Sequence, residues 1–147
     1  MKQLLASLLV AGLVALAPVV SAQATRTFRT RLSPVPVAAY NANVVGTGTV
    51  TATLAGAKLT IDGKYEGLAS AATTAKIFKS NKPGIRGEAI LDLKVSGGTT
   101  GTITGQFDLT PAQVQEIGAS RYYVQLHSEK AAEGNLWGWL MPVQEKK

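Results

Sequence analysis

The residues that could perform catalysis are few and far apart in this sequence. Histidine occurs once, at His127, and cysteine is absent. A redox-metal site needs several imidazoles or thiolates in a fixed geometry, and a thiol nucleophile needs a cysteine. Both kinds of site are therefore excluded, and we expect neither a metal nor any other cofactor.

The remaining catalytic options depend on serine or on paired carboxylates. Ser128 directly follows His127, so the two side chains point to opposite faces of a strand, and no catalytic triad motif is present. A carboxylate pair for sugar hydrolysis would have to come from nine dispersed acidic residues. Glu88 and Asp92 share a strand face only as any i, i+4 pair does. We therefore predict a protein that is not an enzyme.

Aromatic side chains are the best candidates for recognition. Period-two alternation places Trp137 and Trp139 on one face of a C-terminal strand, and Tyr123 and His127 on one face of the preceding strand. Flat rings on a strand can stack on a ligand, but tryptophan more commonly packs in a core. The packing role is favoured, and it predicts that Trp137→Ala destabilises the fold by about 3–5 kcal/mol. A contact surface predicts a loss below about 1 kcal/mol.

Strands must position these side chains, because apolar and polar residues alternate with period two along most of the chain. Such alternation is typical of half-buried strands. Turn-forming residues such as Ser96-Gly97-Gly98 separate the segments, which is the pattern of a sandwich or barrel. The alternating segments are 28–32, 50–54, 59–65, 103–107, 122–128 and 135–140.

One short helix is expected between the strands. Thr110 is a capping residue, Pro111 suits the first helical position and Gln113 completes a capping box. Gly118 should end the helix after two to three turns. We therefore predict an all-β fold: a Greek-key β-sandwich of about seven to nine antiparallel strands with one short connecting helix.

The first 22 residues have the three-part layout of a secretory signal. A lysine gives a positive start, an apolar run extends over 4–20, and small residues precede Ala22. Pro18 interrupts the run, which is only as long as the shortest membrane spans. We predict a signal peptide over 1–22, with cleavage after Ala24 as the alternative, and a single domain over 23–147 without a membrane span. The mature protein is expected in the periplasm or outside the cell.

The charge of the chain is positive, with a formal net value of +6. A basic balance can favour anionic surfaces. The positive residues are scattered, however, except for Arg26, Arg29 and Arg31, and they are not interleaved with aromatic residues as in a nucleic-acid surface. We therefore interpret the positive charge as one that serves ordinary solubility, and we expect no nucleic-acid partner.

Two blocks of the sequence resemble the CHRD (chordin-type) domain family. The block 122–128 followed by 133–140 is similar to Y-V-N-V-H-T and G-E-I-R-G-Q-L of that family. The block 75–78 followed by 83–90 is similar to A-H-I-H-x-G-x-x-G-x-N-G-x-V-V. The resemblance extends from about Phe28 to Leu140, and it implies an extracytoplasmic protein with a layout similar to copper/zinc superoxide dismutases, without implying a reaction.

The chain departs from the family pattern at its polar positions. The two histidines of A-H-I-H are Lys76 and Phe78 here, and the Glu, Arg and Gln of the last motif are Asn135, Trp137 and Trp139. If these strand faces meet, a polar cluster in relatives has become an aromatic one here. The candidate binding cluster consists of Lys76, Phe78, Tyr123, His127, Trp137 and Trp139.

These observations favour an exported, non-catalytic CHRD-domain protein with a binding or structural role. The partner expected is an extracytoplasmic protein or a polysaccharide. One alternative is a carbohydrate- or envelope-binding module that uses the aromatic strand. A second alternative is an enzyme with an unrecognised site.

Overall fold

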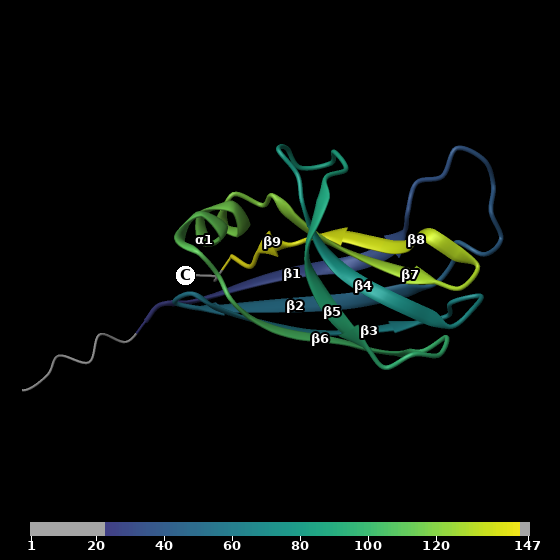
Figure 1. The fold of residues 1–147 in the computed structure, drawn as a ribbon, viewed down its shortest axis with the longest axis horizontal. Helices are drawn as coiled ribbons and strands as arrows, with labels where there is room; N and C mark the ends of the chain where they lie inside the picture. Colours follow the sequence, from purple (N-terminus) through teal and green to yellow (C-terminus); the bar gives the residue numbers. More distant parts are fainter. Residues whose placement is uncertain (1–22, 145–147) are drawn as a thin grey trace, which may run out of the picture.

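The computed structural model describes residues 23–144, which form nine strands and one helix (Figure 1). The predicted signal segment 1–22 lies outside the described residues. The elements are β1 (Thr25–Pro34), β2 (Thr47–Ala55), β3 (Lys58–Glu66), β4 (Ala72–Lys79), β5 (Glu88–Val95), β6 (Gly101–Asp108), α1 (Pro111–Gly118), β7 (Tyr122–Ser128), β8 (Ala131–Trp139) and β9 (Met141–Pro142).

The strands close into an eight-stranded barrel, which corrects the open sandwich predicted from the sequence. The order around the barrel is β1–β2–β3–β6–β5–β4–β7–β8, and β8 returns to β1. Residues 25–32 of β1 pair with β2, whereas Ser33 and Pro34 pair with β8. Because β1 joins both neighbours, the sheet has no open edge there. The predicted all-β class, the strand number and the short helix are confirmed.

The strands β1 and β5 form the two corners of the barrel. β5 pairs with β4 over residues 88–93 but with β6 only through Lys94 and Val95. The wall therefore has two halves, β1–β2–β3–β6 and β4–β7–β8, that meet at the corner strands. The chain passes from β6 through α1 to β7, which lies beside β4, so β4 to β7 have Greek-key order.

Apolar side chains from every long strand fill the barrel. Along β7, Tyr122, Val124 and Leu126 are fully buried and belong to this core, so the alternate residues of the same strand face outward. α1 closes one end of the barrel with the buried Ile117. The residues 23–144 include no helix with the length and apolar character of a membrane span.

Two long loops flank the outer face of β4, β7 and β8. The loop between β4 and β5 rises above the barrel at the top of Figure 1, and the loop between β1 and β2 projects at the right-hand end. Both loops carry exposed apolar side chains: Ile85 on the first, and Val37 and Tyr40 on the second. Tyr40 is 93% exposed, so this loop presents a ring to solvent.

Candidate functional site

The aromatic residues predicted from the sequence meet on the outer face of the barrel. Strand pairing places Phe78 opposite Tyr123 and Tyr123 opposite Trp139, and it places Gln125 opposite Trp137. Because these positions share one side of three neighbouring strands, their side chains form a continuous patch. We call Phe78, Tyr123, Trp137 and Trp139 the aromatic cluster.

The rings of the aromatic cluster are in direct contact. Phe78 stacks on Tyr123 with 5.1 Å between ring centroids and 12° between ring planes. Tyr123 contacts Trp139 at 4.8 Å and Trp137 edge-on at 5.7 Å, and the two indoles lie 6.4 Å apart. These separations are those of favourable aromatic pairs. Tyr123 is the centre of the cluster and is only 1% exposed.

The other rings of the cluster remain partly accessible. Phe78, Trp137 and Trp139 are half-buried, and none of them belongs to the buried core of the barrel. Trp137 packs instead against a small separate cluster of Val35, Val44 and Ala131. The structure therefore gives the indoles both a packing role and an accessible surface, where the sequence left these as alternatives.

Arg86 joins the aromatic cluster to the flanking loops. Its guanidinium lies 5.5 Å from the Trp137 ring centroid, and its Nη2 donates a hydrogen bond of 3.1 Å to the Pro36 carbonyl. The adjacent Gly87 N–H donates to the Tyr123 hydroxyl at 3.0 Å. The β4–β5 loop is thus held over the rings and tied to the β1–β2 loop.

Gly87 is needed where this loop returns to the barrel. A Cβ at this position would collide with the carbonyl oxygen of Lys79. No role for Arg86 was predicted from the sequence. The signal that could have found it is the family block 83–90, which contains Arg86 and follows the block containing Phe78.

His127 lies at the margin of the cluster and both of its ring nitrogens have partners. Its centroid is 6.3 Å from the Phe78 ring. Nδ1 lies 2.8 Å from the Ala132 carbonyl, which can only accept, so neutral His127 carries its proton on Nδ1. Nε2 then accepts from the Gln125 amide at 3.4 Å. This arrangement orients the ring and gives it a structural role.

Lys76, the last member of the binding cluster predicted from the sequence, forms an ion pair away from the aromatic rings. Its ammonium pairs with Asp92 on β5 at 2.7 Å. Asp92 lies opposite Lys76, and Glu88 lies opposite Lys79, with a register shift between Ile77 and Phe78. Because the two lysines are three residues apart on β4, the two carboxylates lie on opposite faces. This corrects the expectation that Glu88 and Asp92 share a face.

Asn135 is fully buried beside the accessible cluster. Its amide Nδ2 donates to the Ser128 hydroxyl at 2.9 Å, and its Oδ1 has no hydrogen-bond partner among the described residues. An unpaired buried acceptor costs free energy unless water or a ligand supplies a donor. No group of three or more metal-ligating side chains is present in residues 23–144.

Two hollows lie on either side of Arg86. The first, of about 310 Å³, is formed by the β4–β5 loop and includes Asn81, Ile85 and Glu88. The second, of about 160 Å³, lies between the β1–β2 loop and the β7–β8 turn and includes Val35 and Asn41. Arg86 lines both hollows and lies over the Trp137 ring, so it joins the hollows to the aromatic cluster. We call Arg86, the two hollows and Trp137 the strip.

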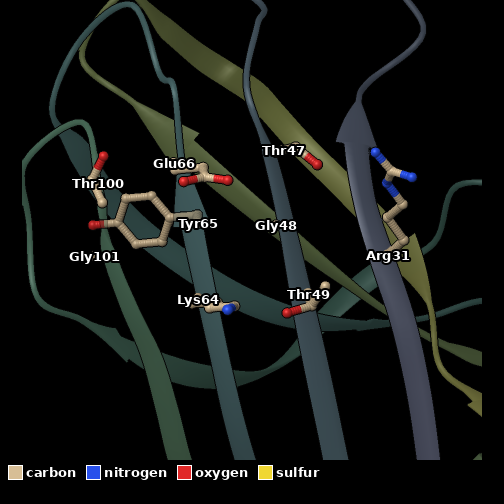
Figure 2. Close-up of a pocket in the computed structure, with 9 residues that line it drawn as sticks. All are labelled: Arg31, Thr47, Gly48, Thr49, Lys64, Tyr65, Glu66, Thr100 and Gly101. Atoms are coloured by element: carbon tan, nitrogen blue, oxygen red, sulfur yellow. The ribbon is translucent and has the colours of Figure 1, made fainter.

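A further hollow of about 370 Å³ lies on the opposite half of the barrel (Figure 2). Arg31, Thr49 and Lys64 occupy one row across β1, β2 and β3. Tyr65 points its ring toward Gly101 in Figure 2, and its hydroxyl donates to the Gly97 carbonyl at 2.8 Å. The exposed side chains of Arg31, Thr49 and Lys64 are typical of a solvated strand face.

A comparison with protein-family models identifies the family. The family model described as CHRD domain matches residues 28–140. The chain therefore belongs to the CHRD domain family, with the extent expected from the sequence. Comparisons with curated proteins and with solved structures gave no match, so the predicted likeness to superoxide dismutases stays a prediction.

Proposed function

We propose that this protein is an exported, non-catalytic CHRD-domain protein that binds a partner through the aromatic cluster and its flanking loops. One observation carries this proposal: Phe78, Trp137 and Trp139 gather on the outside of the barrel and stay partly accessible. Partly exposed aromatic rings are enriched where proteins contact ligands or partners. The exposed Val37, Tyr40 and Ile85 on the two flanking loops extend the same surface.

A location outside the cytoplasm belongs to the same proposal. The three-part layout of residues 1–22 supports export. The absence of cysteine means that the domain needs no disulfide in an oxidising compartment. The partner is then an extracytoplasmic protein or a polysaccharide.

The arrangement of the polar side chains favours binding over catalysis. His127 is the only histidine, and both of its nitrogens are held by neighbouring groups. Glu88 and Asp92 face different sides of β5, so they do not form the carboxylate pair that sugar hydrolysis requires. An enzyme with a different site is the weaker proposal.

Cosedimentation of the mature protein with insoluble envelope material tests the proposal. We expect the wild-type protein to sediment and Trp139→Ala to remain in solution. Arg29→Ala is the control, because Arg29 lies in the opposite half of the barrel, opposite Thr51 of β2, and should bind as the wild type does. Equal sedimentation of Trp139→Ala and wild type, with both folded, would rule out the cluster as the contact surface.

A further inference from the structure

We propose that the strip centred on Arg86 binds a glycan chain whose sugars carry acetamido groups. This inference rests on the proposed function and names the ligand of the same surface. It depends on three features that lie side by side: an accessible indole, a small apolar hollow with polar groups at its rim, and a second hollow beyond Arg86.

The Trp137 ring supplies a stacking surface for a sugar. A sugar ring presents C–H groups to an aromatic face, whereas a guanidinium occupies that face here, 5.5 Å from the ring centroid. Arg86 uses one nitrogen to donate to the Pro36 carbonyl, which leaves further N–H groups for ligand hydroxyls. In this proposal the exposed guanidinium leaves the Trp137 ring when a sugar stacks there, and it donates its free N–H groups to the sugar hydroxyls.

The hollow of about 160 Å³ offers the apolar and polar contacts that an acetamido group needs. Val35, Val44 and Ala131 give it an apolar floor that is separate from the barrel core, and an acetamido methyl can be buried there. Asn41 stands at the rim with its Oδ1 already accepting from the Asn43 N–H at 2.9 Å. Its Nδ2 remains available to donate to the acetamido carbonyl.

The second hollow indicates a chain rather than a single sugar. It measures about 310 Å³ and shares Arg86 with the first. Asn81 and Glu88 line it, and amide and carboxylate groups are suited to hydrogen bonds with hydroxyls. Two adjacent hollows that share one exposed side chain suit consecutive units of a linear polymer.

Titration of the mature protein with chitohexaose tests this inference directly. The two tryptophans of the chain both lie in the aromatic cluster, so intrinsic emission reports only from this site. We expect a saturable change in emission with chitohexaose and at least tenfold weaker binding of cellohexaose, which lacks acetamido groups. Soluble glycan strands from peptidoglycan form a second arm, and tighter binding of these strands would identify the bacterial envelope as the source.

Two variants locate the binding. Asn41→Ala should weaken chitohexaose binding by about fivefold, the usual value of one hydrogen bond, and Arg29→Ala should leave it unchanged. No response to either acetamido glycan at millimolar concentration would overturn the inference, as would equal binding of cellohexaose. If envelope cosedimentation still depends on Trp139 in that case, the proposed function stands and only the ligand assignment fails.

Discussion

At the scale of single residues, the aromatic cluster is a set of side chains that both pack and remain accessible. Period-two alternation in the sequence placed Tyr123 on one face of its strand, and Trp137 and Trp139 on one face of the next strand. Phe78 joined them through the family resemblance, and the strand pairing shows that the faces meet. Alternation could not give their exposure, because exposure depends on loops that fold over the strand face. Alternation also gave no sign of the role of Arg86, because Arg86 lies on such a loop and its contact with Trp137 joins residues far apart in the sequence.

Replacing Trp137 measures the packing part of this role. We expect Trp137→Ala to lower the free energy of unfolding by about 2 kcal/mol, less than a fully buried aromatic residue would. The indole loses contacts with Tyr123, Trp139 and the Val35 cluster, but it is only half-buried. Urea denaturation would measure the change, with Trp137→Phe as the control that retains a ring. A loss below about 0.5 kcal/mol would show that the ring has no packing role.

Glu116 links α1 to the barrel through hydrogen bonds whose strength depends on pH. Its carboxylate accepts hydrogen bonds from the Lys79 ammonium at 3.0 Å and from the Tyr122 hydroxyl at 2.8 Å. The hydrogen bond from Lys79 is the main cause that lowers the pKa of Glu116. A lowered pKa adds stability above the unfolded value of about 4.3, and this stability is lost as the pH falls through the folded value.

The variant Glu116→Gln should therefore cost about 1–2 kcal/mol at pH 7. The variant should also lose less stability than the wild type when the pH falls from 5 to 3. Thermal denaturation across this range would measure both effects. Glu129→Gln, at an exposed acid, is the control and should follow the wild-type profile. Parallel profiles for Glu116→Gln and wild type would contradict this role.

At the scale of elements, most strands and the helix were predictable from local pattern. The alternating segments correspond to β1, β2, β3, β6, β7 and β8. Alternation did not identify β4 and β5, and register shifts interrupt the pairing of β4 at two places. A β-bulge adds one residue to a strand and breaks period two, as the consecutive apolar residues 89–91 show.

The capping box of α1 formed as its sequence predicts. The Thr110 hydroxyl accepts from the Gln113 N–H at 3.3 Å, and the Gln113 side chain accepts from the Thr110 N–H at 2.9 Å. We expect Thr110→Ala to lower the free energy of unfolding by about 1 kcal/mol. Chemical denaturation measures this change, and Thr100→Ala in the β5–β6 turn is the matched control. Equal stability of the two variants would show that the cap is dispensable.

At the scale of the whole molecule, barrel closure could not be predicted from the sequence. Alternation is the same in an open sandwich and a closed barrel, because it reports burial and not strand order. Closure is seen only in the pairing of β1 with both β2 and β8. Gly138 permits the approach of β8, since a Cβ there would collide with the Thr30 hydroxyl and lie 2.6 Å from the Arg31 carbonyl.

The proposed export is also a matter for the whole chain, and the N-terminus of the mature protein tests it. We expect the mature protein to begin at Gln23, because small residues precede Ala22 as signal peptidase requires. Mass spectrometry of protein recovered from outside the cytoplasm would give the first residue. A start at Thr25 would support the alternative cleavage after Ala24, and an intact Met1 would contradict export by a cleaved signal.

Contact between the aromatic cluster and the partner can be measured by acrylamide quenching of tryptophan emission. Both tryptophans lie in the cluster and are half-buried, so a partner bound there must shield them. We predict that the quenching constant falls when the mature protein binds solubilised envelope material or an acetamido glycan. Binding demonstrated by sedimentation or calorimetry without any change in quenching would contradict a contact at the aromatic cluster and place it elsewhere on the barrel.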